Sequence, residues 1–222
     1  MTTGRPDIKG LILVPSLITL AITILRLVGE LQHWNPKLFN PEPGGGGALI
    51  GVSWLPPIFG IYFAIKLASS GEYPSSAGRV LGFAALALAV LMGSAFAGFA
   101  INRTPGNLIA LLTGAVGAIA ALVIASKSWP ALFKTLLAYG YAARIPIAII
   151  MFVAIYGNWQ THYDVPPSPE FPAMHWTLKW LLIGALPQLL LWIAYTVLTG
   201  LLTGGLTMLA YRKKIGKQPL EA

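Results

Sequence analysis

The stretch that decides the fold is PALFKTLLAYGYAARIPIAIIMFVAIY, residues 130–156. Its length and apolar character predict a membrane-spanning helix, because a bilayer core about 30 Å thick takes ~20 apolar helical residues. Arg144 lies near the middle of the stretch, roughly 20 Å from either end at about 1.5 Å rise per residue. A guanidinium at that depth cannot easily reach the headgroups, and its insertion costs roughly 2.5–3.5 kcal/mol. We therefore expect Arg144 to face a bundle interior or a wet cavity and to mark a functional site.

The composition of the 222-residue chain extends this interpretation to the whole sequence. Hydrophobic residues make up 56% and charged residues 10%, against about 25% charged residues in a soluble domain. The backbone must satisfy its own hydrogen bonds in lipid, so the apolar runs are expected to be helices. We expect a single membrane domain over residues 1–222. The chain has no cysteine, which excludes disulfides, thiol nucleophiles and thiolate metal sites.

The apolar runs predict an all-α polytopic integral membrane protein with six transmembrane helices and an outer interfacial helix. The last run, 177–211, is too long for one perpendicular crossing and too short for two, so Pro187 is expected to open the last crossing. The segment before it is expected to lie at the interface, which favours Trp176 and Trp180. The expected spans are about 8–29, 48–69, 79–101, 107–125, 130–156 and 187–211, with the interfacial helix at about 174–186.

Lysine and arginine divide unevenly between the two sides of such a membrane domain. With a cytoplasmic N-terminus, ten of these residues fall on the cytoplasmic side, four on the outer side, and Arg144 lies between. The positive-inside rule then places both termini in the cytoplasm, and we expect a bacterial inner membrane protein. We interpret the net charge of +8 as an indication of membrane orientation. The expected partners are membrane lipids, and no nucleic acid is expected. The four outer residues are Arg26, Lys37, Arg103 and Lys179.

Several polar residues are candidates to contact Arg144 or to bind a ligand with it. Arg26 and Glu30 lie one helical turn apart and are expected to pair on one face. Glu30 is the only acid close to the interior of a span, which makes it a candidate counter-ion, although its depth differs from that of Arg144 by roughly 15–20 Å. The other candidates are carbonyls freed by Pro146 or Pro187, an anionic ligand, the amide of Gln188, and the hydroxyls of Tyr139, Tyr141 and Tyr195.

The histidines raise the alternative of a metal site on the outer side. His33, His162 and His175 all fall in the predicted outer segments, and Asp164 is close to His162 in sequence. Imidazole and carboxylate groups suit zinc, iron or copper, and a catalytic zinc needs only three protein ligands. The other interpretation is that these side chains hydrogen-bond the two outer loops to each other and to headgroups. No pair has the spacing of two ligands on one helix.

The segment SKSWPALFKTLLAYGYAARIPIAIIM, residues 126–151, resembles the signature of Yip1-type multi-pass membrane proteins. The resemblance rests on the Phe133-Lys134 pair, the Tyr141-Ala142 step and Pro146 ahead of an apolar span. It implies a scaffold or membrane-organising role and no enzymatic activity. It covers about a tenth of the chain, and Arg144 before the proline departs from the pattern, as does the long loop that follows.

These observations leave three interpretations of function. The leading one is a non-enzymatic binding or accessory subunit whose outer aromatic loops or Arg144 cavity contact lipid, a small anion or a protein partner. The second is a small transporter that uses Arg144 to bind an anionic substrate, and the third is a metal-dependent enzyme acting on lipid. No nucleotide-binding or hydrolase motif is present, and no cofactor is expected. Gly200 and Gly204 have GxxxG spacing, which predicts close helix packing within the chain or in a homodimer.

Overall fold

The computed structural model describes residues 7–43, 47–101, 108–167 and 171–215. These ranges contain helices and connections and no strand. The long helices are α1 (Ile8–Leu31), α2 (Leu55–Ser69), α3 (Ala77–Ile101), α4 (Leu108–Ala125), α5 (Pro130–Gly157) and α7 (Trp192–Ile215). α6 (Trp176–Lys179) and two π-helical segments, η2 (Trp180–Ala185) and η3 (Pro187–Leu191), precede α7.

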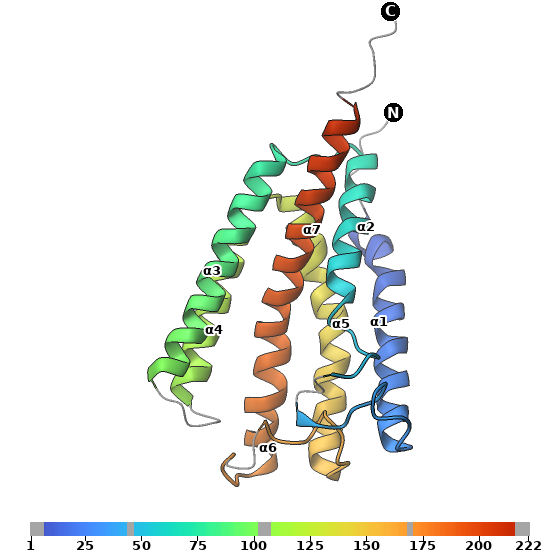
Figure 1. Cartoon of the computed structure of the whole chain (residues 1–222), viewed down its shortest axis with the longest axis vertical. Helices are drawn as coiled ribbons and strands as arrows, with labels where there is room; N and C mark the ends of the chain where they lie inside the picture. Colours follow the sequence, from blue (N-terminus) through green and yellow to red (C-terminus); the bar gives the residue numbers. More distant parts are fainter. Residues whose placement is uncertain (1–6, 44–46, 102–107, 168–170, 216–222) are drawn as a thin grey trace, which may run out of the picture.

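The helices run up and down as one bundle (Figure 1). The start of α1 and the end of α7 lie at the same end of the bundle. We call the opposite end, where the connections 32–54 and 158–175 lie, the loop end. Five helical segments are long and apolar enough to cross a membrane: Ile8–Leu31, Ala77–Ile101, Leu108–Ala125, Pro130–Gly157 and Trp176–Tyr211. The described residues therefore have the all-helical class expected from the sequence, and the length and composition of these segments support the multi-pass membrane character.

The second expected span is shorter than the sequence indicated. Residues 48–54 are not helical, and α2 has only 15 residues. The cause is the pair Pro56-Pro57, which falls in the first turn of the helix. A proline there starts a helix, because its missing N–H is one that no intrahelical carbonyl needs. The two prolines thus begin α2 and do not kink the middle of a span.

The faces of α1 show which environment surrounds the bundle. Its buried side chains include Thr19, Thr23 and Glu30, whereas its exposed ones include Leu13 and Leu17, which are 56% and 55% exposed. A helix of a water-soluble bundle would place its polar face outward. α1 does the reverse, as expected for a helix whose outer face meets lipid and whose polar groups turn into the protein.

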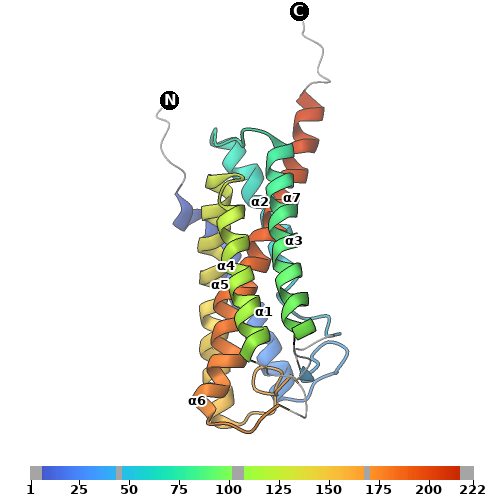
Figure 2. The ribbon, with the colours of Figure 1, turned by 90° about the vertical axis from the view of Figure 1, so that its left-hand side faces the viewer.

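The last expected span differs from the sequence interpretation at Pro187. The helical backbone continues from residue 176 to residue 215 without the expected break, and its turns widen into η2 and η3 on either side of Leu186. Proline lacks the N–H for a regular helical hydrogen bond, and a local π-helix is one way to keep the chain helical through it. The segment that was expected to be a separate interfacial helix is continuous with α7 (Figure 2).

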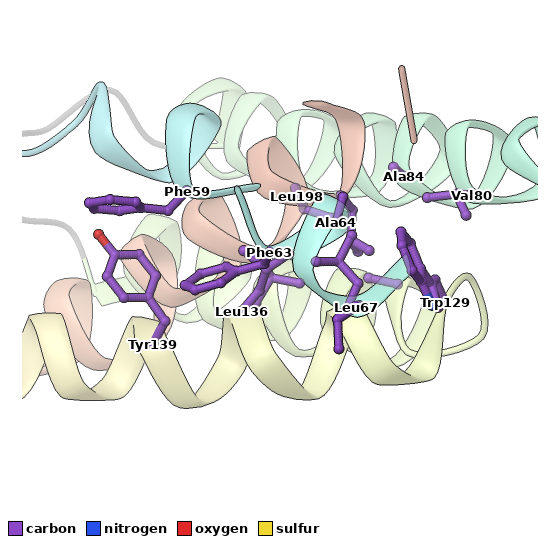
Figure 3. Packing of buried hydrophobic residues seen from close by; sticks show 14 of the residues in the cluster. Phe59, Phe63, Ala64, Leu67, Val80, Ala84, Trp129, Leu136, Tyr139 and Leu198 are labelled. Atoms are coloured by element: carbon purple, nitrogen blue, oxygen red, sulfur yellow. The ribbon is translucent and has the colours of Figure 1, made fainter. Parts of the chain in front are cut away.

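The half of the bundle away from the loop end is filled by a hydrophobic core. Phe63, Leu67, Leu132 and Leu136 are at most 1% exposed. Phe59 and Phe63 lie edge-on to the ring of Tyr139, with centroids 5.3 and 5.6 Å away (Figure 3). The predicted close packing at Gly200 occurs within the chain. A Cβ on Gly60 of α2 would lie 2.5 Å from the Cα of Gly200, so the two backbones touch.

Candidate functional site

A cavity of about 710 Å³ occupies the half of the bundle nearer the loop end. The cavity is lined by α1, both long connections, α3, α4, α5, the π-helical region ahead of α7, and the first residue of α7. Its volume lies in the range of pockets that hold small molecules, roughly 300–1,000 Å³. The lining is mainly apolar, and its charged or polar side chains include Arg26, Arg144, His162 and Gln188.

Arg144 of α5 faces this cavity, as the sequence predicted. Its side chain is only 4% exposed. Nη1 donates a hydrogen bond to Oε1 of Gln188 at 3.3 Å, and the guanidinium carbon lies 4.5 Å from the ring centroid of Trp192. Neither partner carries a charge, and within the described ranges no Asp or Glu lies within 4.0 Å of Arg144. The cation is therefore held by an amide and an aromatic face, without a carboxylate.

The π-helical turns place the two partners of Arg144 on the cavity wall. Gln188 is in η3, Trp192 follows it by four residues, and both line the cavity together with Pro187 and Leu191. Residues four apart lie on one helix face, so one side of this helix presents the amide and the indole to the guanidinium. π-helical turns inside longer helices are frequent at functional sites. The proline that widens the helix therefore lies beside the residues that hold Arg144.

A second polar cluster joins α1 to the connection 158–175. Arg26 Nε donates to Glu30 Oε1 at 2.8 Å, which is the pair predicted from their spacing. Glu30 Oε2 also accepts from the backbone N–H of His162 at 2.9 Å, and His162 Nδ1 lies 2.8 Å from the same oxygen. The Glu30 carboxylate is fully buried. Its partners are thus Arg26 and His162, and it does not serve as the counter-ion of Arg144.

A tight turn after α5 positions His162 for this contact. α5 ends with Asn158 in the left-handed conformation that asparagine tolerates at helix ends. The buried carboxylate of Asp164 accepts from the backbone N–H groups of Gln160 and Thr161 at 2.9 and 2.7 Å. Burial lowers the pKa of the His162 imidazole, and the Glu30 carboxylate offsets part of that shift. The ring is therefore neutral at pH 7, and its Nδ1–H donates to Glu30.

The tyrosine candidates make other contacts than a hydrogen bond to Arg144. The ring of Tyr141 is 39% exposed and does not line the cavity. The hydroxyl of Tyr195 donates to the carbonyl of Ser53 at 2.9 Å, which ties α7 to the connection 32–54. The hydroxyl of Tyr139 lies 2.8 Å from that of Thr19. Of the proposed side-chain partners, Gln188 is the one that the structure brings to Arg144.

The metal candidates are distributed over different contacts. His162 contacts Glu30, Asp164 caps its own turn, and His175 Nδ1 lies 2.8 Å from the hydroxyl of Thr177. His33 is the second residue of the connection 32–54 and has a positive φ of 50°. Among the described residues, no three His, Asp or Glu side chains lie close enough to hold a metal ion. The structure does not bring His33, His162, His175 and Asp164 together as one ligand set.

The two long connections are held by contacts other than the hydrogen bonds expected between them. Trp34 packs edge-on against Phe39 within its own connection, at 5.3 Å between centroids. Tyr163 packs in a small buried cluster with Trp159 and Val52, and its hydroxyl donates to the carbonyl of Thr23 at 3.3 Å. The connection 158–175 is therefore held mainly to α1, through His162 and Tyr163.

Trp192 is the site residue that sequence reasoning missed. The sequence contains one indication of this role. Trp192 follows Gln188, a candidate partner of Arg144, by one helical turn, so both side chains lie on the same helix face. The apolar residues of α3 and α4 that line the cavity gave no such signal, since they resemble any lipid-facing or core position.

Comparisons with models of protein families, with curated proteins and with solved structures find no match to this chain.

Proposed function

We propose that this chain is a non-enzymatic integral membrane protein that binds an anionic group at Arg144, inside the cavity near the loop end. The observation that carries the proposal is a buried arginine on the wall of a large cavity, with no carboxylate partner among the residues that the structure describes. An intramembrane cation is stabilised by a partner or ligand of opposite charge. Arginine also suits carboxylate and phosphate oxygens, because its planar group can donate two parallel hydrogen bonds.

The arrangement of the cavity supports binding over transport. Phe63, Leu67, Leu132 and Leu136 fill the bundle on the side away from the loop end. An anion at Arg144 would have to displace this packed core to continue to the other side. The transporter interpretation therefore requires a large rearrangement, whereas binding requires none. A scaffold role, as the resemblance to Yip1-type proteins implies, is compatible with a bound lipid or anion.

The proposal includes the membrane orientation. We infer six crossings in a bacterial inner membrane, with α2 completed by the non-helical residues 48–54, and with both termini and the turn at Lys127 in the cytoplasm. The positive-inside distribution supports this orientation. Single-cysteine variants of the cysteine-free chain test it with an impermeant thiol reagent. Gln32→Cys should react on intact cells and Lys127→Cys only after membrane disruption, and the reverse pattern would overturn the orientation.

Anion binding at Arg144 is tested by a variant that places a carboxylate within hydrogen-bonding distance of the guanidinium. Gln188→Glu keeps the shape of the side chain and forms an ion pair with Arg144 at the position of the present hydrogen bond. We expect this variant to keep or exceed the parent's thermal stability in maltoside micelles. Its affinity for methyl phosphate and acetate, measured by thermal shift, should fall by about 10–100-fold, which corresponds to ~1.4–2.7 kcal/mol.

Gln32→Glu is the matched control. It makes the same chemical change and the same change of net charge at an exposed position just after α1. Its affinity for both anions should equal that of the parent. If neither anion binds the parent saturably, or if Gln188→Glu binds them as the parent does, Arg144 is not an anion site and the proposal fails.

A further inference from the structure

The part of the cavity wall that α3 and α4 form is apolar. On α3 it is formed by Leu91, Ala95 and Phe99, and on α4 by Ala110, Leu111 and Gly114. None of these side chains can hydrogen-bond a polar ligand. The space between them and Arg144 therefore suits hydrocarbon, with the Arg144 guanidinium at one end of it.

Two residues of this wall also line a second, apolar groove on α3. The groove is lined by Met92, Ala95, Phe96, Phe99 and Ala100, so it shares Ala95 and Phe99 with the cavity. Phe96 and Phe99 are 77% and 69% exposed. An apolar path from the cavity to the lipid-facing side of the helix would thus run past Ala95 and Phe99, the two side chains that border both spaces.

The helix hairpin that borders this path is held loosely near the loop end. The buried residues of α3 are Ala77, Val80, Ala84, Ala87 and Gly98. The first four belong to the core of the other half, whereas Gly98 is buried against Ala110 of α4. α3 moves away from α7 toward the loop end (Figures 1 and 2). The second half of the hairpin therefore packs mainly on itself, beside the path.

We propose that the anion bound at Arg144 is the headgroup of a lipid-like amphiphile whose hydrocarbon chain leaves the cavity between Ala95 and Phe99 and lies along α3. This inference rests on the proposed function and names the class of its ligand. The Arg144 cation in the cavity and the apolar groove that adjoins it at Ala95 and Phe99 match the two parts of such a molecule. The ligand enters sideways from the bilayer, past the α3–α4 hairpin.

The test compares a phosphate that carries a chain with one that does not. Dodecyl phosphate and methyl phosphate are titrated at a fixed concentration of maltoside micelles, and the thermal shift is measured. The parent should bind dodecyl phosphate at least tenfold more tightly. Ala95→Trp should lower the affinity for dodecyl phosphate at least tenfold by filling the path, and should change that for methyl phosphate by less than twofold. Val116→Trp, at a position that is 66% exposed on α4 and outside the cavity, should change neither affinity.

A cysteine variant keeps the proposal testable should Ala95→Trp fail to fold. In Ala95→Cys, dodecyl phosphate should slow modification of the thiol by a small alkylating reagent, and methyl phosphate should not. Equal affinity of the parent for both phosphates, or no protection of the thiol, would mean that the ligand is a free anion. The inference would then fail while the proposed function stands. If neither phosphate binds, the proposed function itself fails.

Discussion

Glu30, near the end of α1, accepts hydrogen bonds from both the backbone N–H and the imidazole of His162, 132 residues further along the chain. The same carboxylate holds Arg26, so one buried acid fixes both a cation and the turn after α5. His162 and Arg26 also line the cavity. The Glu30 contact thus determines the shape of the cavity at the loop end without taking part in the contacts of Arg144.

Removal of the Glu30 charge should strongly destabilise the protein. Glu30→Gln leaves the Arg26 guanidinium, whose side chain is 10% exposed, without its carboxylate. Breaking a buried ion pair on one side costs about 3–5 kcal/mol. The free energy of unfolding in mixed micelles should fall by that amount. Glu42→Gln, an exposed position, is the control and should change it by less than about 0.5 kcal/mol. A loss that small at Glu30 would contradict the role assigned to this carboxylate.

Acidification should destabilise the fold through His162. Burial lowers the pKa of this imidazole in the folded protein, below its ordinary value of 6.5. The unfolded chain therefore binds the proton more readily, so the stability is complete above pH 6.5 and is lost as the pH falls from there toward the lowered pKa. Melting temperatures between pH 7.5 and pH 5 should fall in the parent and fall less steeply in His162→Gln. Parallel curves for the two proteins would show that another group controls the acid response.

The sequence was sufficient for features that depend on local spacing or on composition. The helical membrane class follows from apolar runs, and the Arg26–Glu30 pair follows from a separation of one helical turn. The burial of Arg144 follows from the cost of exposing a guanidinium to lipid. Gln188 was named as one of several possible partners, because a buried amide near a buried cation is a favourable contact.

Features that depend on distant segments or on small backbone changes were not accessible from the sequence. Nothing in residues near Glu30 indicates a contact with His162, which only the up-and-down arrangement brings to the same end of the bundle. Pro187 was read as the start of a helix, whereas the chain stays helical by widening its turns. The cavity depends on the divergence of α3 from α7, and small residues such as Ala95 give no sign of it.

The backbone contact between α2 and α7 should make Gly60 intolerant of any side chain. A Cβ there would lie 2.5 Å from both the Cα and the carbonyl oxygen of Gly200, and backbone atoms cannot yield as a flexible side chain does. Gly60→Ala should destabilise the protein by about 1–3 kcal/mol, as overpacking does. Gly82→Ala is the matched control, because a Cβ on this helical glycine of α3 meets no atom within 4 Å. It should be neutral or stabilise by up to about 1 kcal/mol. The opposite order of the two melting temperatures would contradict the close packing of these helices.

The contact between Arg144 and Trp192 should appear as a coupling energy. The guanidinium carbon lies 4.5 Å from the ring centroid, within the reach of a cation–π interaction. A double-mutant cycle with Arg144→Leu and Trp192→Leu, followed by the free energy of unfolding in mixed micelles, should give a coupling of about 0.5–2 kcal/mol. A cycle of Arg144→Leu with Trp34→Leu serves as the control, because Trp34 lies in the connection 32–54, is 45% exposed and does not line the cavity. Its coupling should stay below about 0.5 kcal/mol. Equal couplings in the two cycles would show that the indole of Trp192 does not stabilise the buried cation, and would leave the hydrogen bond to Gln188 as the contact observed for Arg144 among the described residues.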